Sequence, residues 1–215
     1  MSRAPDVPAP PVALSRERIV AAALALIDRD GLQAVTMRRV AEALGVQAPS
    51  LYNHVRSKEA LLDAVAGSVM DRVDTSGFDG DDWRAAIETW AWSYYDALVA
   101  HPNLVPHLVV AFGRLDAALA RADQVYAGLL RQGWTPSRAT RIAAAIRYAV
   151  YGAALGSFAG GFTARAARFP HLAEVQRLSA DSRRVDRAAL RMLIDRFLDG
   201  LEQSPRRPAP ARRGG

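Results

Sequence analysis

Residues 36–58 read TMRRVAEALGVQAPSLYNHVRSK, and this stretch decides the fold. Thr36 is suited to begin a helix because its hydroxyl can accept a hydrogen bond from a free N–H in the first turn. Apolar residues then recur at helical spacing, at Val40, Ala41 and Leu44. Gly45 follows where the helix must end, since glycine tolerates the left-handed conformation of a C-terminal cap. The stretch therefore predicts a short helix and a tight turn.

A second helix is expected from about residue 48 to residue 55, with Pro49 in its first turn, where the missing N–H costs nothing. Leu51 and Val55 would face inward. The other face carries Gln47, Ser50, Tyr52, Asn53 and His54. Two short helices around a glycine turn are typical of a helix-turn-helix, whose second helix enters the major groove of DNA.

The polar face has the chemistry that a groove requires. Amide and hydroxyl side chains can donate to and accept from base edges, and Arg38 can donate twice to guanine. Tyr52 and Lys58 suit contacts with phosphates. Two packed helices in a bundle are the structural alternative, but no acidic residue occurs between Gly45 and Lys58, which favours DNA.

The longer run TMRRVAEALGVQAPSLYNHVRSKEALLDAV resembles the DNA-binding domain of the tetracycline-repressor (TetR) family, and LYNHVRSKEALL is its most specific part. The resemblance covers residues 15–73 and implies a dimeric bacterial repressor with a ligand-responsive C-terminal domain. Ala48 stands where a tetracycline repressor has a polar base-reading side chain, which implies a different operator. The DNA-binding candidates are Thr36, Arg38, Gln47, Ala48, Ser50, Tyr52, Asn53, His54 and Lys58.

Composition bounds the remaining possibilities. The chain has 215 residues, half of them hydrophobic, and no cysteine, which excludes disulfides and thiolate metal sites. It shows no secretory signal and no apolar run of the ~20 residues that a membrane span needs. We therefore expect a cytoplasmic protein that does not contact a membrane, and the family resemblance implies a bacterial one. Residues 15–58 hold seven basic and four acidic residues, so positive charge gathers on the predicted DNA-binding part.

The chain divides into four parts by pattern. Residues 1–14 are expected to form a disordered arm, and residues 204–215 a disordered basic tail. Residues 15–73 would form the helix-turn-helix domain with a connecting fourth helix. Residues 74–203 would form a ligand-binding and dimerisation domain with helices near 83–100, 104–112, 115–132, 135–159 and 186–201. No segment shows a strand pattern, so the predicted fold is all-α.

The C-terminal part should provide a partner surface and a ligand site. In the family that the sequence resembles, two late helices pair with their copies, so we expect a homodimer through helices near 137–159 and 186–201. Such a dimer would read a near-palindromic operator in double-stranded DNA. Aromatic residues among the preceding helices suggest an apolar site for a small hydrophobic or aromatic molecule. The candidates are Trp90, Tyr94, Asn103, His107, Phe112, Trp134, Tyr148 and Tyr151.

The resemblance does not extend to the residues that would bind tetracycline. His107 falls near the position where tetracycline repressors place a histidine that helps to hold a drug-bound magnesium ion, but Trp90 stands where an amide is expected. We therefore predict no metal site, no cofactor and no tetracycline binding.

Two other classes of protein compete with a regulator. An enzyme is disfavoured because the sequence contains no H-E-x-x-H motif, phosphate-binding loop or nucleophile elbow. The second alternative is a helical module that binds a ligand or a protein partner without sequence-specific DNA binding. Repression is the default mode of regulation, since blocking a promoter requires only binding.

Overall fold

A computed structural model describes residues 13–155, 168–169, 171–172 and 182–203. Every regular element in these ranges is an α-helix or a 3-10 turn, which agrees with the all-α prediction. The predicted arm up to residue 12, the predicted helix end at 156–159 and the predicted tail lie outside the described residues. No helix among the described residues is long and apolar enough to cross a membrane.

The chain forms two compact units, Met1–Val65 and Ala66–Gly215. The boundary falls inside helix α4 (Lys58–Met70), so this helix belongs partly to each unit. The first unit contains α1 (Arg16–Asp30), the 3-10 turn η1 (Leu32–Ala34), α2 (Met37–Leu44) and α3 (Ala48–Leu51).

Local signals explain where these helices begin and end. The hydroxyls of Ser15 and Thr36 accept hydrogen bonds from the first turns of α1 and α2. The Ser57 hydroxyl accepts from the N–H of Ala60 at 3.1 Å and caps α4 in the same way. Gly45 ends α2 at φ 69° and ψ 29°, the left-handed conformation that disfavours other residues. Caps at all four positions follow the sequence prediction.

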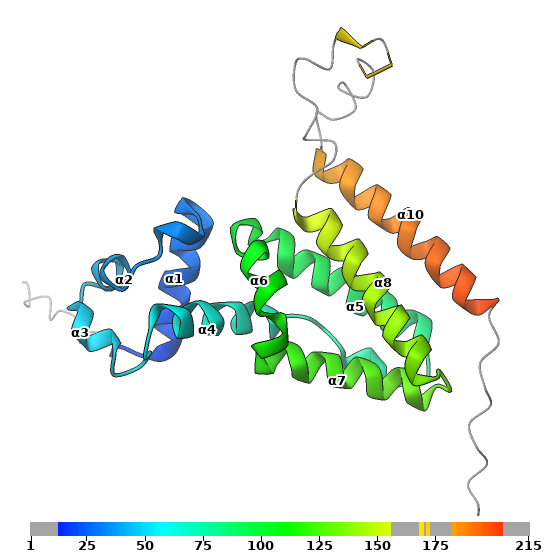
Figure 1. The fold of residues 1–215 in the computed structure, drawn as a ribbon, viewed down its shortest axis with the longest axis horizontal. Coiled ribbons are helices and arrows are strands. Elements are labelled where there is room, and N and C mark those ends of the chain that lie inside the picture. The colour runs from blue at the N-terminus through cyan, green and yellow to red at the C-terminus, as the bar shows by residue number, and fades with distance from the viewer. Residues whose placement is uncertain (1–12, 156–167, 170, 173–181, 204–215) are drawn as a thin grey trace, which may run out of the picture. The chain divides into compact units, whose positions relative to one another are not determined.

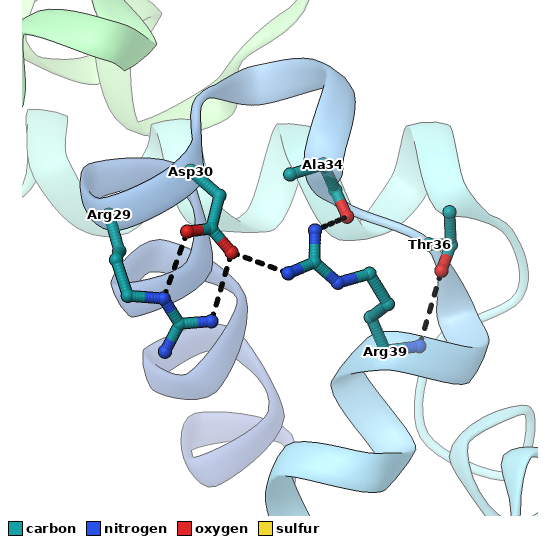
Figure 2. A network of polar contacts seen from close by, with 5 residues as sticks. All are labelled: Arg29, Asp30, Ala34, Thr36 and Arg39. Atoms are coloured by element: carbon teal, nitrogen blue, oxygen red, sulfur yellow. Dashed lines mark hydrogen bonds and ion pairs between the residues drawn. The ribbon is translucent and has the colours of Figure 1, made fainter.

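A charged network fixes the corner between α1 and α2 (Figure 2). Arg29 donates two hydrogen bonds to the Asp30 carboxylate, at 3.0 and 2.9 Å. Arg39 of α2 donates to the same carboxylate and also to the backbone oxygen of Ala34, at 3.2 Å. Asp30 therefore joins the end of α1 to the start of α2.

The second unit is a bundle around α8 (Figure 1). Its helices are α5 (Trp83–Val99), α6 (Val105–Ala111), α7 (Asp116–Arg131), α8 (Pro136–Leu155) and α10 (Ser182–Glu202). Three 3-10 turns connect them: η2 (Ser76–Asp79), η3 (Pro102–Leu104) and η4 (Phe112–Arg114). Helix α8 packs against α5, α6, α7 and α10.

Ion pairs and aromatic stacking link α10 to α5. Arg84 contacts Asp199 at 2.8 Å, and Arg187 contacts Asp96 at 2.6 Å. The guanidinium groups of Arg187 and Arg191 each lie 4.6 Å from the ring centroid of Trp92. Stacking on an aromatic face adds to these half-exposed ion pairs, which alone contribute little.

Candidate nucleic-acid interface and ligand cavity

The helix-turn-helix buries its apolar residues and exposes its polar ones. Leu51 and Val55 are buried, as the sequence predicts, so α3 and the turns after it are anchored to the first unit. Regular α-helix ends at Leu51 rather than near residue 55, because the next residues close tighter bonds, with Tyr52 N–H donating to Pro49 and His54 N–H to Leu51.

The nine DNA-binding candidates lie in one unit and on neighbouring elements. Six are exposed: Thr36, Arg38, Gln47, Tyr52, Asn53 and His54. Three are half-buried: Ala48, Ser50 and Lys58. Gln47 is the N-cap residue of α3 but makes no side-chain cap bond, so its amide is not used in holding the helix.

Arg38 is an exposed cation among the DNA-binding candidates and is engaged in an ion pair. Its Nε donates to Glu42 at 2.8 Å, one helical turn along α2, and 85% of its side chain is exposed. The interaction raises the pKa of Arg38, chiefly through the hydrogen bond to Glu42. Glu42 is the acidic residue nearest to this candidate base contact.

The second unit contains a cavity of about 360 Å³ between the end of α4 and helices α5, α7 and α8. This volume lies in the range of small-molecule sites. The lining residues are Met70, Val73, Trp90, Tyr94, Phe112, Ala118, Arg121, Ala122, Val125, Tyr126, Thr140, Ala143, Ala144 and Arg147.

Three of the eight predicted ligand-binding residues line this cavity: Trp90, Tyr94 and Phe112. Tyr151 lies directly behind the wall, where its hydroxyl accepts a hydrogen bond from the Tyr94 hydroxyl at 2.8 Å. Burial raises the pKa of Tyr94 well above its usual value, so this phenol stays neutral and can donate.

The other four predicted residues lie outside the cavity lining. Trp134 packs edge-on against Trp83, with ring centroids 5.6 Å apart. Tyr148 is 77% exposed on α8. Asn103 is exposed in η3, and His107 is half-buried on α6. Their roles in ligand binding stay predictions.

Two arginines in the wall were not expected from the sequence. Arg147 of α8 lies flat over Phe112, with its guanidinium carbon 3.6 Å from the ring centroid. Arg121 of α7 donates to the backbone oxygen of Asp71 at 3.1 Å. The Nε atom of each arginine is buried and has no hydrogen-bond partner. The sequence contains one indication that Arg147 has no ion-pair partner on its own helix: no acidic residue lies within four positions of it.

The described residues contain no cluster of three or more His, Asp or Glu side chains that could hold a metal ion. The arrangement offers hydrogen bonding and stacking: an exposed polar helix face in one unit and an aromatic cavity with two cations in the other.

Residues 19–65 match the sequence profile of the bacterial regulatory proteins of the tetR family. The chain is 36% identical over 146 residues to the class C tetracycline repressor protein of Escherichia coli, a match that covers 66% of this chain and 65% of that protein. The chain therefore spans slightly less than two thirds of that relative.

The solved structures of two proteins are similar to this structure over most of the chain. A protein of Streptomyces coelicolor described as "a possible TetR family transcriptional regulator" is 30% identical, with a TM-score of 0.68 over 87% of this chain and 98% of that one. A TetR variant from Acinetobacter baumannii in complex with minocycline is 27% identical, with a TM-score of 0.66 over 89% of this chain and 98% of that one.

Proposed function

The chain belongs to the tetR family of bacterial regulatory proteins, and from this premise we propose that it binds operator DNA as a homodimer and leaves it when a small organic molecule occupies the cavity. The observation that carries the proposal is the pairing, in one chain, of a polar face on α3 and its flanks, with no acidic residue between Gly45 and Lys58, and an aromatic cavity in the second unit. In a repressor, these two sites are what binding and release require.

The exposed face of α3 and its flanks supports DNA reading. Gln47 and Asn53 offer amides that can pair with adenine, and Arg38 can pair with guanine once it leaves Glu42. Tyr52 and Lys58 suit phosphates, which position the protein without reading sequence.

Exposed apolar side chains on α8 and α10 support dimerisation. They are Tyr148 (77%), Leu155 (54%), Met192 (66%) and Leu193 (50%), and together they are called the α8–α10 surface. Helix α10 also buries Leu190, Ile194 and Leu198, so it is apolar on more than the side that packs on α8. Exposed apolar surface of this kind marks an interaction site, and a two-fold dimer would present two helix-turn-helix motifs to two half-sites.

Helix α4 supplies a covalent path between the two functions. It begins at Lys58, a candidate phosphate contact, and ends at Met70, a wall residue of the cavity. A ligand that prefers one position of Met70 would bias the whole helix, since a helix transmits displacement along its axis. The ligand must bind the released state more tightly than the DNA-bound state, or it shifts nothing.

The DNA-binding half of the proposal is tested by fluorescence anisotropy on the duplex from just upstream of the protein's own gene, against a scrambled duplex at two salt concentrations. Lys58→Ala should weaken binding to both duplexes and reduce the salt dependence, because it removes a phosphate contact. Ser50→Ala should reduce the preference for the upstream duplex instead. Wild-type binding that is equal on both duplexes and insensitive to salt, and unchanged in both variants, would contradict the assignment.

A further inference from the structure

The cavity wall is aromatic and carries positive charge without a matching acid. Trp90, Tyr94 and Phe112 present aromatic surface, and Arg121 and Arg147 are the charged members of the lining. No Asp or Glu of the described residues lines the cavity. An apolar enclosure strengthens the field of an arginine, because there is little water to screen it.

Arg147 is the wall cation without an ion pair among the described residues. Its guanidinium lies flat over Phe112 and also interacts with the Tyr94 hydroxyl. The Nε atom is buried, so the Nη groups, which point outward in the plane of the guanidinium, are the donors left for a ligand.

Arg121, unlike Arg147, already has an acidic partner in the protein. Its Nη2 already contacts Asp71, through the backbone oxygen at 3.1 Å and the carboxylate at 3.7 Å. Part of its charge is therefore compensated inside the protein. A ligand anion would therefore be attracted mainly by the uncompensated charge of Arg147 and more weakly by Arg121.

We propose that the cavity binds an aromatic acid, with its carboxylate on the Nη groups of Arg147 and its ring among Trp90, Tyr94 and Phe112. This inference rests on the proposed function, because it names the ligand class of the same cavity. A carboxylate can pair with the two Nη groups of a guanidinium through two parallel N–H···O bonds. A neutral molecule of the same shape supplies the ring contacts alone.

A matched pair of probes tests the proposal on the full-length protein without DNA. Anthracene-2-carboxylate and anthracene-2-carboxamide have the same ring and nearly the same size, and only the first is an anion at pH 7. Isothermal titration calorimetry should give a dissociation constant for the acid that is roughly 10- to 100-fold lower than that for the amide.

Variants in α8 test whether Arg147 causes the preference for the acid over the amide. Arg147→Met should bind acid and amide with equal affinity, and Arg147→Lys should keep part of the preference, since it retains charge but loses the two-point edge. Arg138→Met is the control: Arg138 also belongs to α8 and lies over an aromatic ring, 5.1 Å from the centroid of Trp134, but outside this cavity. It should behave like the wild type.

Equal affinity of the wild type for acid and amide, or no binding of the acid at millimolar concentration, would overturn the proposal without requiring any variant to fold. An acid preference that persists in Arg147→Met would overturn the role of Arg147. Because the titration contains no DNA, its outcome is independent of the regulatory function. An acid that binds as expected but does not release DNA would leave the ligand class standing and contradict ligand-controlled release.

Discussion

Asp30 shows how one side chain holds a corner of the helix-turn-helix unit. Its carboxylate accepts hydrogen bonds from Arg29 and Arg39, and these lower its pKa to about 2, with Arg29 the largest cause. A carboxyl in an unfolded chain has a pKa of about 3.9. A depressed pKa in the folded state means that ionised Asp30 stabilises the fold above that value and loses the contribution as the pH falls toward 2.

We therefore predict that Asp30→Asn lowers the melting temperature at pH 7 and that the difference from the wild type shrinks as the pH falls from about 4 to about 2. Thermal unfolding followed by circular dichroism across this range measures it. Asp81→Asn, at an exposed carboxylate before α5, serves as the control and should change little at either pH. A difference that stays constant with pH would show that the network is not electrostatic in origin.

A second prediction concerns the side chain of Glu42. It holds Arg38 in an exposed ion pair, and such pairs contribute little to stability. Glu42→Gln should tighten binding to operator DNA several-fold at low salt, because it frees Arg38 and removes a negative charge near the phosphates. The gain should shrink at high salt, which screens the removed charge.

Anisotropy titrations at two salt concentrations measure this gain, with Asp123→Asn in α7 as the matched loss of an exposed acid in the other unit. Affinity that is unchanged or weaker in Glu42→Gln would show that Arg38 does not reach the DNA.

At the scale of elements, η2 and α7 meet at a contact that only glycine allows. A Cβ atom placed on Gly128 would lie 2.6 Å from the Cβ and 2.8 Å from the backbone oxygen of Phe78. Phe78 is itself buried, so it has no free space into which to move. The chain can keep this contact only by leaving position 128 without a side chain.

Gly128→Ala should therefore destabilise the protein by about 1–3 kcal/mol despite the better helix propensity of alanine. The free energy of unfolding from urea titration measures it. Gly113→Ala, where an added Cβ meets nothing within 4 Å, is the control and should be nearly neutral. Equal stability of the two variants would show that α7 can shift away from η2 at little cost.

The sequence predicted the helices well where the signal is local. Ser15, Thr36, Gly45 and Ser57 cap helices as expected because capping depends on residues within one turn. The end of α3 was predicted too late, since tight turns after Leu51 depend on how Val55 is buried in the unit.

The cavity was harder to predict because its wall gathers residues from distant segments. Aromatic content pointed to Trp90, Tyr94 and Phe112, but it gives no means of separating these from Trp134, which packs on Trp83 instead. Arg147 has no acidic neighbour within four positions in the sequence, but only the fold places Phe112 against its guanidinium.

At the scale of the whole molecule, the α8–α10 surface is the dimer interface that we propose. Leu193→Lys places a charge on an exposed apolar residue of this surface, so we expect it to convert a dimer into a monomer and to weaken operator binding by at least tenfold. Light scattering coupled to gel filtration measures the mass. Val110→Lys, at a residue 72% exposed on α6, is the control and should remain dimeric.

A monomeric wild-type protein, or a dimer that persists in Leu193→Lys, would contradict this interface. The test also separates stability from assembly, because position 193 is half exposed and its replacement should leave the unfolding of each unit nearly unchanged.

We propose above all that this chain reads a DNA sequence as a dimer. The most direct measurement is selection of tight binders from a random duplex library at physiological salt, followed by sequencing. We expect enrichment of one near-palindromic site whose half-sites lie one helical turn or a multiple of it apart, roughly 34–36 Å per turn, and loss of the enrichment with Ser50→Ala. A library that emerges without any preferred sequence would contradict it.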